Sequence, residues 1–356
     1  MDYSGGMTRV RILWLCIPLL CLATNLAAAA QTAASYRYFR LGNQTDAKAT
    51  SQPGFALMGG GDDLDEAFRW LCKRSGGGDF LVLRAHGDDE YNSYIKDLCH
   101  LNSVATVIIP DHAAATDPFV EKAIRHASGL FIAGGDQANY INFWMGSPVQ
   151  EALNDAIRRS VPIGGTSAGL AVLGEWVYSA QGDKPEDADL DSKTALANPF
   201  GPRITLVHEF LQIPILKGVI TDTHFAKRNR MGRSLVFLAR VNAPDGKPVP
   251  PNGPKIRGIG VEERAAILLE PDGKATVIGH GSAYFIDSCD ASGLMLGGRF
   301  GVMASHKPLT FGPFDVQRVG PKHTFELKAW HGDAIRYTLT VEQGTVTSTQ
   351  PGGGIY

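Results

Sequence analysis

The chain has 356 residues, of which 44% are hydrophobic and 20% are charged, a composition typical of a globular protein with a large core. Its formal net charge of −2 gives no electrostatic basis for binding nucleic acid. No pair among its 5 cysteines has the spacing of a zinc finger, so we expect no structural metal.

The first 30 residues have the pattern of a secretory signal peptide. Arg9 and Arg11 form a basic start, residues 12–26 are largely apolar, and residues 28–30 offer small side chains for cleavage. The apolar run is too short and too interrupted for a membrane anchor. We therefore expect cleavage near Ala30 and a secreted protein, periplasmic or extracellular, with no stable membrane anchor.

Three cysteines follow the expected cleavage point: Cys72, Cys99 and Cys289. In an oxidising compartment Cys72 and Cys99 could form a disulfide and leave one thiol over. All three could equally be buried thiols, and the sequence leaves both alternatives open.

Strand and helix patterns alternate through the first half of the chain, after a polar segment at residues 31–52 that predicts a flexible lead-in. Short apolar runs predict strands at residues 55–58, 80–83, 105–109, 129–133 and 161–164. Helical patterns separate them, at residues 62–74, 94–98, 118–127 and 148–159. This alternation predicts an α/β fold of three layers, in which helices cover both faces of a doubly wound, mainly parallel sheet.

Ligands of such a sheet bind beyond the carboxyl ends of its strands. Glycines gather at that edge, at residues 59–61, 134–135 and 164–165. The last third of the chain is richer in strand patterns, at residues 256–261, 265–269, 275–278, 283–286, 324–327 and 335–341. We expect these later strands to form an antiparallel extension packed on the core.

Residues 165–169 read Gly-Thr-Ser-Ala-Gly, between the apolar run at 161–163 and a helical stretch at 170–178. A serine between glycines at a strand-to-helix turn is typical of a nucleophile elbow, where the free N–H groups of the helix start can stabilise an oxyanion. The plain alternative is a glycine-rich loop in which Ser167 is incidental. Residues 181–203 are polar and predict a loop near this site.

A nucleophilic serine needs a base and a group that orients the base. His224 follows the apolar strand pattern at 219–221, at the edge where Ser167 is expected. Glu262 and Glu263 end another strand pattern, and the alternation of side chains along a strand lets only one of them face the site. The plain alternatives are a structural histidine and an exposed charged turn.

Four motifs in this order resemble the cyanophycinase family of serine peptidases. They are Gly134-Gly135-Asp136-Gln137, Gly-Thr-Ser-Ala-Gly at 165–169, Asp-x-His-Phe-x-x-Arg-x-Arg-x-x-Arg at 222–233, and Gly-Ile-Gly-Val-Glu-Glu at 258–263. The resemblance covers about residues 55–290 and implies a fold like that of class I glutamine amidotransferases. On this basis we expect a signal peptide (1–30), the lead-in (31–52), a peptidase domain (53–290) and a β-rich C-terminal extension (291–356).

The resemblance implies a catalytic triad of Ser167, His224 and Glu263, and an oxyanion hole formed by the backbone N–H groups of Gly135 and Ala168. It places the substrate-binding pocket at Gln137, Asp222, Thr223, Arg228, Arg230 and Arg233. Family members release β-Asp-Arg dipeptides from the end of cyanophycin, a poly-aspartate chain with arginine on each side chain. Arginine forks grip carboxylates, and Asp222 could receive the guanidinium or amine of the substrate. The family also implies a homodimer, and neither a metal nor an organic cofactor.

Two positions depart from the family pattern: Thr223 stands where glutamine is frequent, and Glu262 where aspartate is usual. Thr223 keeps open a related peptidase that acts on other aspartyl or isoaspartyl peptides. A secreted binding protein without activity is a further alternative. An esterase of the α/β-hydrolase type would need the order serine, acid, histidine, which this chain could supply only if Asp191 were the acid.

Overall fold

The computed structural model describes residues 1–3, 35–184, 187–243, 255–288 and 303–356. Contacts divide the chain into residues 1–33 and a second unit, Ala34–Tyr356, which contains all the helices and strands below. Most of the expected signal peptide, and Cys289, lie outside the described residues. None of the helices in the described ranges is long and apolar enough to span a membrane.

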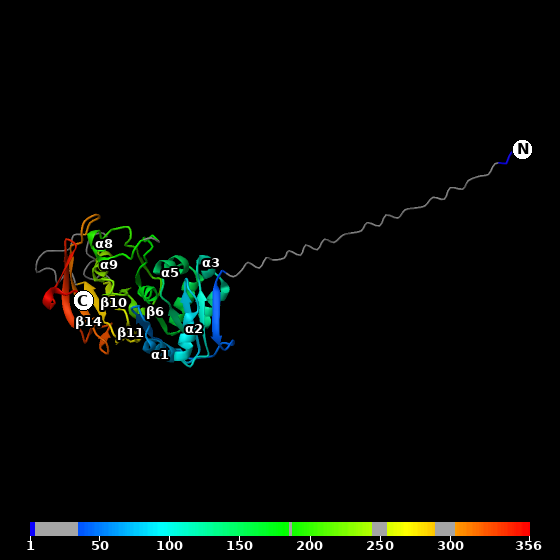
Figure 1. Ribbon diagram of the computed structural model, residues 1–356, viewed down its shortest axis with the longest axis horizontal. Helices are drawn as coiled ribbons and strands as arrows, with labels where there is room; N and C mark the ends of the chain where they lie inside the picture. The colour runs from blue at the N-terminus through cyan, green and yellow to red at the C-terminus, as the bar shows by residue number, and fades with distance from the viewer. Residues whose placement is uncertain (4–34, 185–186, 244–254, 289–302) are drawn as a thin grey trace. The chain divides into compact units, whose positions relative to one another are not determined.

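Five parallel strands form the middle of the first sheet (Figure 1). In hydrogen-bonded order they are β4 (Ser103–Ile108), β3 (Asp79–Arg84), β5 (Gly129–Ile132), β6 (Ile163–Thr166) and β2 (Phe55–Met58). Antiparallel strands extend both sides: β1 (Arg37–Gly42) on β4, and β11 (Ala265–Leu269), β12 (Lys274–Gly279), β15 (Thr324–Glu326) and β16 (His331–Gly332) beyond β2. Nearly all side chains of the five central strands are buried, as their uninterrupted apolar sequences predict.

Helices cover both faces of this sheet. Met58, Phe80 and Phe131 belong to a buried cluster shared with α1 (Asp65–Arg74) and α2 (Glu90–Leu98). The neighbouring strand residues point the other way, into a cluster shared with α3 (His112–Ala115), α4 (Pro118–His126), α5 (Gln137–Trp144) and α6 (Pro148–Arg158). The predicted three-layer α/β arrangement is confirmed.

A second sheet holds eight of the described strands that follow β6. Its order is β18 (Thr345–Ser348), β17 (Ile335–Glu342), β14 (Phe311–Val319), β13 (Ala283–Ser288), β10 (Arg257–Val261), β9 (Val219–Asp222), β7 (Trp176–Tyr178) and β8 (Leu206–His208). Three helices belong to this half of the described chain: the short α7 (Ala168–Ala171) and α8 (Ser192–Ala197), and the longer α9 (Met231–Asn242), with 3₁₀ turns at Pro214–Leu216 and Pro351–Gly353. The strands after residue 303 are therefore hydrogen-bonded into both sheets, through β12 and β13, and do not merely pack on them.

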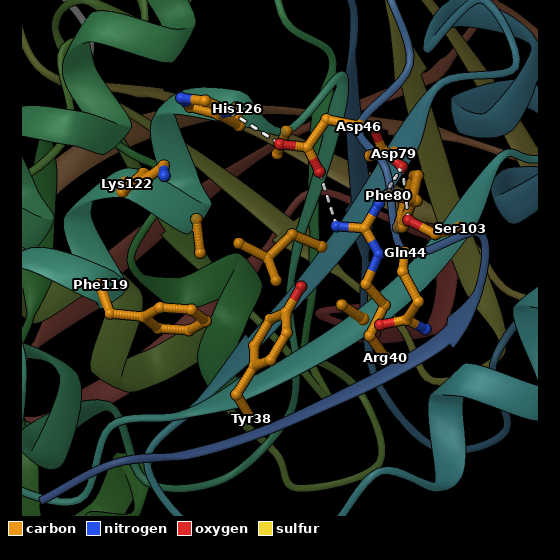
Figure 2. A pocket seen from close by; sticks show the side chains of 14 residues that line it. Tyr38, Arg40, Gln44, Asp46, Asp79, Phe80, Ser103, Phe119, Lys122 and His126 are labelled. Carbon is orange, nitrogen blue, oxygen red and sulfur yellow. Dashed lines mark hydrogen bonds and ion pairs between the residues drawn. The ribbon is translucent and has the colours of Figure 1, made fainter. Parts of the chain in front are cut away.

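The prediction of a flexible lead-in is wrong for residues 37–42, which form β1 at the edge of the first sheet. Edge strands expose much of their side chains, so β1 lacks the apolar pattern that reveals the central strands. Arg40 anchors it by donating to Asp46 at 2.7 Å and to Asp79 at 2.9 Å. Figure 2 shows these bonds at a pocket between β1 and α4. In this pocket the Ser103 hydroxyl donates to Asp79, and the His126 ring is bonded to Asp46.

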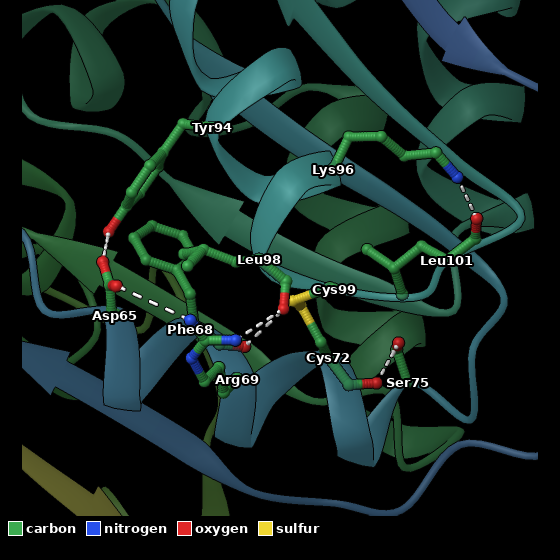
Figure 3. The surroundings of a disulfide bond; sticks show 10 residues. All are labelled: Asp65, Phe68, Arg69, Cys72, Ser75, Tyr94, Lys96, Leu98, Cys99 and Leu101. Atoms are coloured by element: carbon green, nitrogen blue, oxygen red, sulfur yellow. Dashed lines mark hydrogen bonds and ion pairs between the residues drawn. A yellow bond between two sulfur atoms is a disulfide. The ribbon is translucent and has the colours of Figure 1, made fainter.

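Cys72 in α1 and Cys99, which follows α2, are joined by a disulfide (Figure 3). Around it the Phe68 and Tyr94 rings meet edge to face, and Arg69 donates to the carbonyl oxygen of Leu98. Of the two alternatives that the sequence leaves open, the structure therefore has the cross-link between α1 and α2.

Candidate active site

Ser167 lies in the sharp turn between β6 and α7, with φ 51° and ψ −121°. Residues other than glycine rarely adopt a positive φ, and backbone strain of this kind is concentrated at functional sites. The turn is so tight that a Cβ atom on Gly169 would lie 2.0 Å from the carbonyl oxygen of Ile132. Both features are those of a nucleophile elbow.

His224 reaches Ser167 from the second sheet, just beyond the end of β9. Its Nε2 lies 2.7 Å from Ser167 Oγ. The imidazole packs against the glycine turn after β2, where a Cβ atom on Gly60 would lie 2.4 Å from His224 Cε1. Residues 59–61 stood out in the sequence as glycines at the ligand-binding edge, but the sequence did not show that they make room for the histidine ring.

Glu263 completes the hydrogen-bonded chain from the end of β10. Its Oε1 lies 2.7 Å from His224 Nδ1. The neighbouring Glu262 points elsewhere and accepts hydrogen bonds from Tyr284 Oη at 2.5 Å and from the N–H of Ser282 at 2.8 Å. Three side chains from the ends of three strands thus form a continuous chain, Ser167–His224–Glu263.

The surroundings of His224 suit a proton acceptor. Burial lowers the pKa of His224, as do the positive charges of Arg228 and Arg230, while the hydrogen bond to Glu263 opposes the shift. The imidazole is therefore neutral at neutral pH and free to accept a proton. Because the hydrogen bond with His224 lowers the pKa of Glu263, that carboxylate stays ionised.

The expected oxyanion donors border the same pocket as Ser167. Gly135 follows β5, Ala168 follows Ser167, and both line a pocket of about 620 Å³. The Tyr140 hydroxyl donates to the carbonyl oxygens of Ala133 at 2.8 Å and Gly134 at 3.1 Å, which fixes the turn after β5. No motif in the sequence pointed to this tyrosine.

Five of the six residues expected to bind substrate line this pocket: Gln137, Thr223, Arg228, Arg230 and Arg233. Arg228 is the most accessible of these three arginines, with 45% of its side chain exposed, against 7% for Arg230 and 2% for Arg233. Asp189, which the sequence analysis did not single out, also lines the pocket and accepts from Arg228 and Arg230 at 2.6 Å each. It is one of several aspartates in a polar loop, so no pattern distinguished it.

Asp222 is the exception, because its buried carboxylate is not among the groups that line the pocket. Arg233 grips it with two hydrogen bonds, of 2.9 Å from Nε and 2.6 Å from Nη2, and Ser234 adds a third. A buried arginine needs such a counter-charge. The expectation that Asp222 receives the substrate therefore requires correction: in the structure it holds Arg233.

Thr223, at the position where the family frequently has glutamine, is also engaged by an arginine. Arg230 donates to its side-chain hydroxyl and to its carbonyl oxygen, at 3.0 Å each. Within the described residues, no cluster of three or more His, Cys, Asp or Glu side chains could hold a metal ion.

Comparison with known proteins finds similar peptidases. The model of peptidase family S51 matches residues 84–200, a range that includes Ser167 and ends before His224 and Glu263. The cyanophycinase of Synechococcus elongatus is 26% identical over 247 residues, which are 66% of this chain and 68% of that protein. The cyanophycinase of Nostoc sp. (strain PCC 7120 / SAG 25.82 / UTEX 2576) is 29% identical over 171 residues, 47% of this chain and 48% of that protein.

A solved peptidase from an acI-B1 Actinobacterium aligns with 78% of this chain and 98% of its own length, at 14% identity and a TM-score of 0.48. From the family match and the curated relatives, the chain is a hydrolase of the serine peptidase type. Residues 84–200 are thus similar to peptidase family S51, and the curated relatives named here are cyanophycinases.

Proposed function

We propose that this chain is a secreted serine exopeptidase that hydrolyses cyanophycin to β-Asp-Arg dipeptides. The observation that carries the proposal is the chain of two 2.7 Å hydrogen bonds, Ser167–His224–Glu263, beside a pocket lined by arginines. The cyanophycinases among its relatives support the choice of substrate.

The proposed reaction is acyl transfer to water. His224 Nε2 takes the proton of Ser167 Oγ, which attacks the scissile carbonyl, and the N–H groups of Gly135 and Ala168 hold the oxyanion. Glu263 keeps the imidazole oriented and stabilises its charged form. His224 then protonates the leaving amine, and a water activated by the same imidazole releases the acyl group from Ser167.

The pocket carries both signs of charge, as a dipeptide of aspartate and arginine does. Arg228 offers an accessible guanidinium for a carboxylate of the substrate. Asp183 and Asp187 line the same pocket and supply negative charge for a guanidinium of the substrate, which would compete with Arg203, the donor to Asp183 at 2.5 Å. The Thr223 hydroxyl accepts a hydrogen bond from Arg230, so this side chain should select among substrates less strictly than an unpaired glutamine would. Other aspartyl or isoaspartyl peptides are therefore the second candidate substrate class.

The test is to incubate the purified mature protein with cyanophycin granules and to measure β-Asp-Arg release. We expect release by the wild type, and a loss of at least about a thousandfold in Ser167→Ala, because the nucleophile is removed. Ser93→Ala, which changes an exposed serine of α2, should match the wild type.

Activity of Ser167→Ala at the wild-type level would contradict the mechanism. If the protein hydrolyses only isoaspartyl peptides that lack arginine, these peptides take the place of cyanophycin as the proposed substrate. If it hydrolyses neither class, a binding protein without activity is favoured.

Secretion is part of the proposal and rests on the signal pattern of residues 1–30 together with the Cys72–Cys99 disulfide, which forms in oxidising compartments. Intact mass and N-terminal sequencing of protein recovered from the periplasm or medium should give a start near residue 31. An uncleaved chain retained in the cytoplasm would contradict it. The expected homodimer stays a prediction for size-exclusion chromatography with light scattering.

A further inference from the structure

The side chain of Tyr356 packs against the segment that carries His224 and the pocket arginines. Its ring meets the ring of Phe225 at 6.1 Å and that of Tyr284 at 5.9 Å, both edge to face. Its hydroxyl donates to Asn229 Oδ1 and accepts from the N–H of Met231, each at 3.0 Å.

The two aromatic neighbours of Tyr356 adjoin the Ser167–His224–Glu263 chain. Phe225 directly follows His224, and its ring packs on Gly260, where a Cβ atom would lie 2.5 Å from it. Tyr284 donates its hydroxyl proton to Glu262, the neighbour of Glu263. The Tyr356 ring is thus one residue removed from both the histidine and the carboxylate.

The Tyr356 hydroxyl is bonded to the turn that joins two of the pocket arginines. Asn229, with φ 48°, forms the turn between Arg228 and Arg230, and Met231 begins α9. The N-cap residue of α9 makes no side-chain hydrogen bond to the first N–H groups of the helix. Instead, the Tyr356 hydroxyl accepts from the backbone N–H of Met231, and the Ser192 hydroxyl accepts from the backbone N–H of Arg233 at 3.1 Å. Burial raises the pKa of Tyr356 to about 12, so the hydroxyl keeps its proton and can donate and accept together.

Tyr356 is itself held by the β-rich extension. The Tyr337 hydroxyl of β17 donates to the carbonyl oxygen of Ile355 at 2.9 Å, and Gln350 Nε2 donates to that of Gly354 at 2.8 Å. The extension therefore fixes Tyr356 on one side, and Tyr356 contacts the His224–Met231 segment on the other.

We propose that Tyr356 is a positioning residue for the peptidase site, and that the β-rich extension acts on the site through it. The ring fixes His224 through Phe225, and the hydroxyl fixes Arg228 and Arg230 through Asn229 and Met231. This inference rests on the proposed function and adds a role for the extension.

The two parts of the role separate in two variants. Tyr356→Phe keeps the ring and removes the hydroxyl, while Tyr356→Ala removes both. Tyr94→Phe is the matched control, because it deletes one hydroxyl bonded to Asp65 on the surface of α1 and α2. The measurements are kcat and KM for β-Asp-Arg release, the melting temperature, and the rate at which a fluorophosphonate probe labels Ser167.

For Tyr356→Phe we expect KM to rise about tenfold with kcat and labelling rate unchanged, because the buried N–H of Met231 loses its acceptor and the arginine turn loosens. For Tyr356→Ala we expect the same rise in KM together with a fall of about tenfold in kcat and in labelling rate, because His224 loses its support. Tyr94→Phe should match the wild type in all three.

Wild-type KM in Tyr356→Phe with wild-type labelling in Tyr356→Ala would overturn the proposal, whatever the change in melting temperature. If Tyr356→Ala does not fold, KM and kcat of Tyr356→Phe decide. If the wild type reacts with the probe but releases no β-Asp-Arg, the proposed substrate is wrong, and the labelling rates still decide whether Tyr356 positions His224.

Discussion

His224 is the residue on which the chemistry depends, because each ring nitrogen has a different partner. Glu263 Oε1 lies 2.7 Å from Nδ1 and Ser167 Oγ lies 2.7 Å from Nε2. An ionised carboxylate can only accept a hydrogen bond, so the proton of the neutral ring belongs on Nδ1. Nε2 is then free to take the proton of Ser167.

The pH dependence of the reaction should report the lowered pKa of His224. Activity requires the neutral imidazole. We therefore expect kcat/KM to be still level at about pH 6.5, the ordinary pKa of histidine, and to decline only at lower pH, where His224 becomes protonated. Arg228 is one of the charges that lower this pKa. In Arg228→Met the acidic limb of the profile of kcat/KM against pH should therefore move to higher pH.

Lys73→Met is the control for this shift, since it removes an exposed charge of α1, a helix that contributes no residue to the pocket. An acidic limb in Arg228→Met that stays in place, or moves to lower pH, would contradict the role given to Arg228.

Site residues that lie in a motif at the end of a strand could be predicted from the sequence. Residues whose role depends on contacts with distant parts of the chain could not. Ser167, His224 and Glu263 each follow a short apolar strand, so the edge of the sheet brings them together. Asp189 lies in a polar loop with other aspartates, and nothing local shows that it meets two arginines. Asp222 lies in the family motif, but the sequence does not show that Arg233 encloses it.

Among the structural elements, the glycine turn after β2 is the one that the His224 ring requires. Gly60, with φ +95°, lies so close that a Cβ atom would meet the imidazole at 2.4 Å. In Gly60→Ala we expect a loss of about a hundredfold in kcat, because a displacement of the ring by about 1 Å disrupts proton transfer from Ser167.

Gly146→Ala is the matched control for this prediction. Gly146 also has a positive φ, +75°, but a Cβ atom there would meet nothing within 4 Å. Both variants should lose stability through backbone strain, and only Gly60→Ala should lose activity. Equal activities in the two variants would contradict the proposed fit between the turn and His224.

The central strands were predictable because both of their faces are buried, which leaves unbroken apolar runs. β1 was not, because an edge strand with partly exposed side chains looks like a polar linker. The division of the later strands between two sheets also depends on pairing between distant segments, such as β9 with β10 and β12 with β15, which periodicity does not encode.

Across the whole molecule, the site lies where the two sheets meet. β6 of the first sheet carries Ser167, while β9 and β10 of the second lead to His224 and Glu263. Backbone hydrogen bonds join the turns here, from the N–H of His224 to the carbonyl oxygen of Gly59 at 2.8 Å and from that of Arg264 to Gly60 at 2.9 Å. The packing of one sheet against the other therefore sets the distance between nucleophile and base.

The most direct test of the central claim is to map the site of covalent labelling by a fluorophosphonate probe. Peptide mass spectrometry should place the adduct on Ser167, and Glu263→Gln should slow its formation by at least about a hundredfold, because the imidazole loses the carboxylate that orients it. An adduct on another residue, or labelling of Glu263→Gln at the wild-type rate, would contradict a Ser167–His224–Glu263 triad.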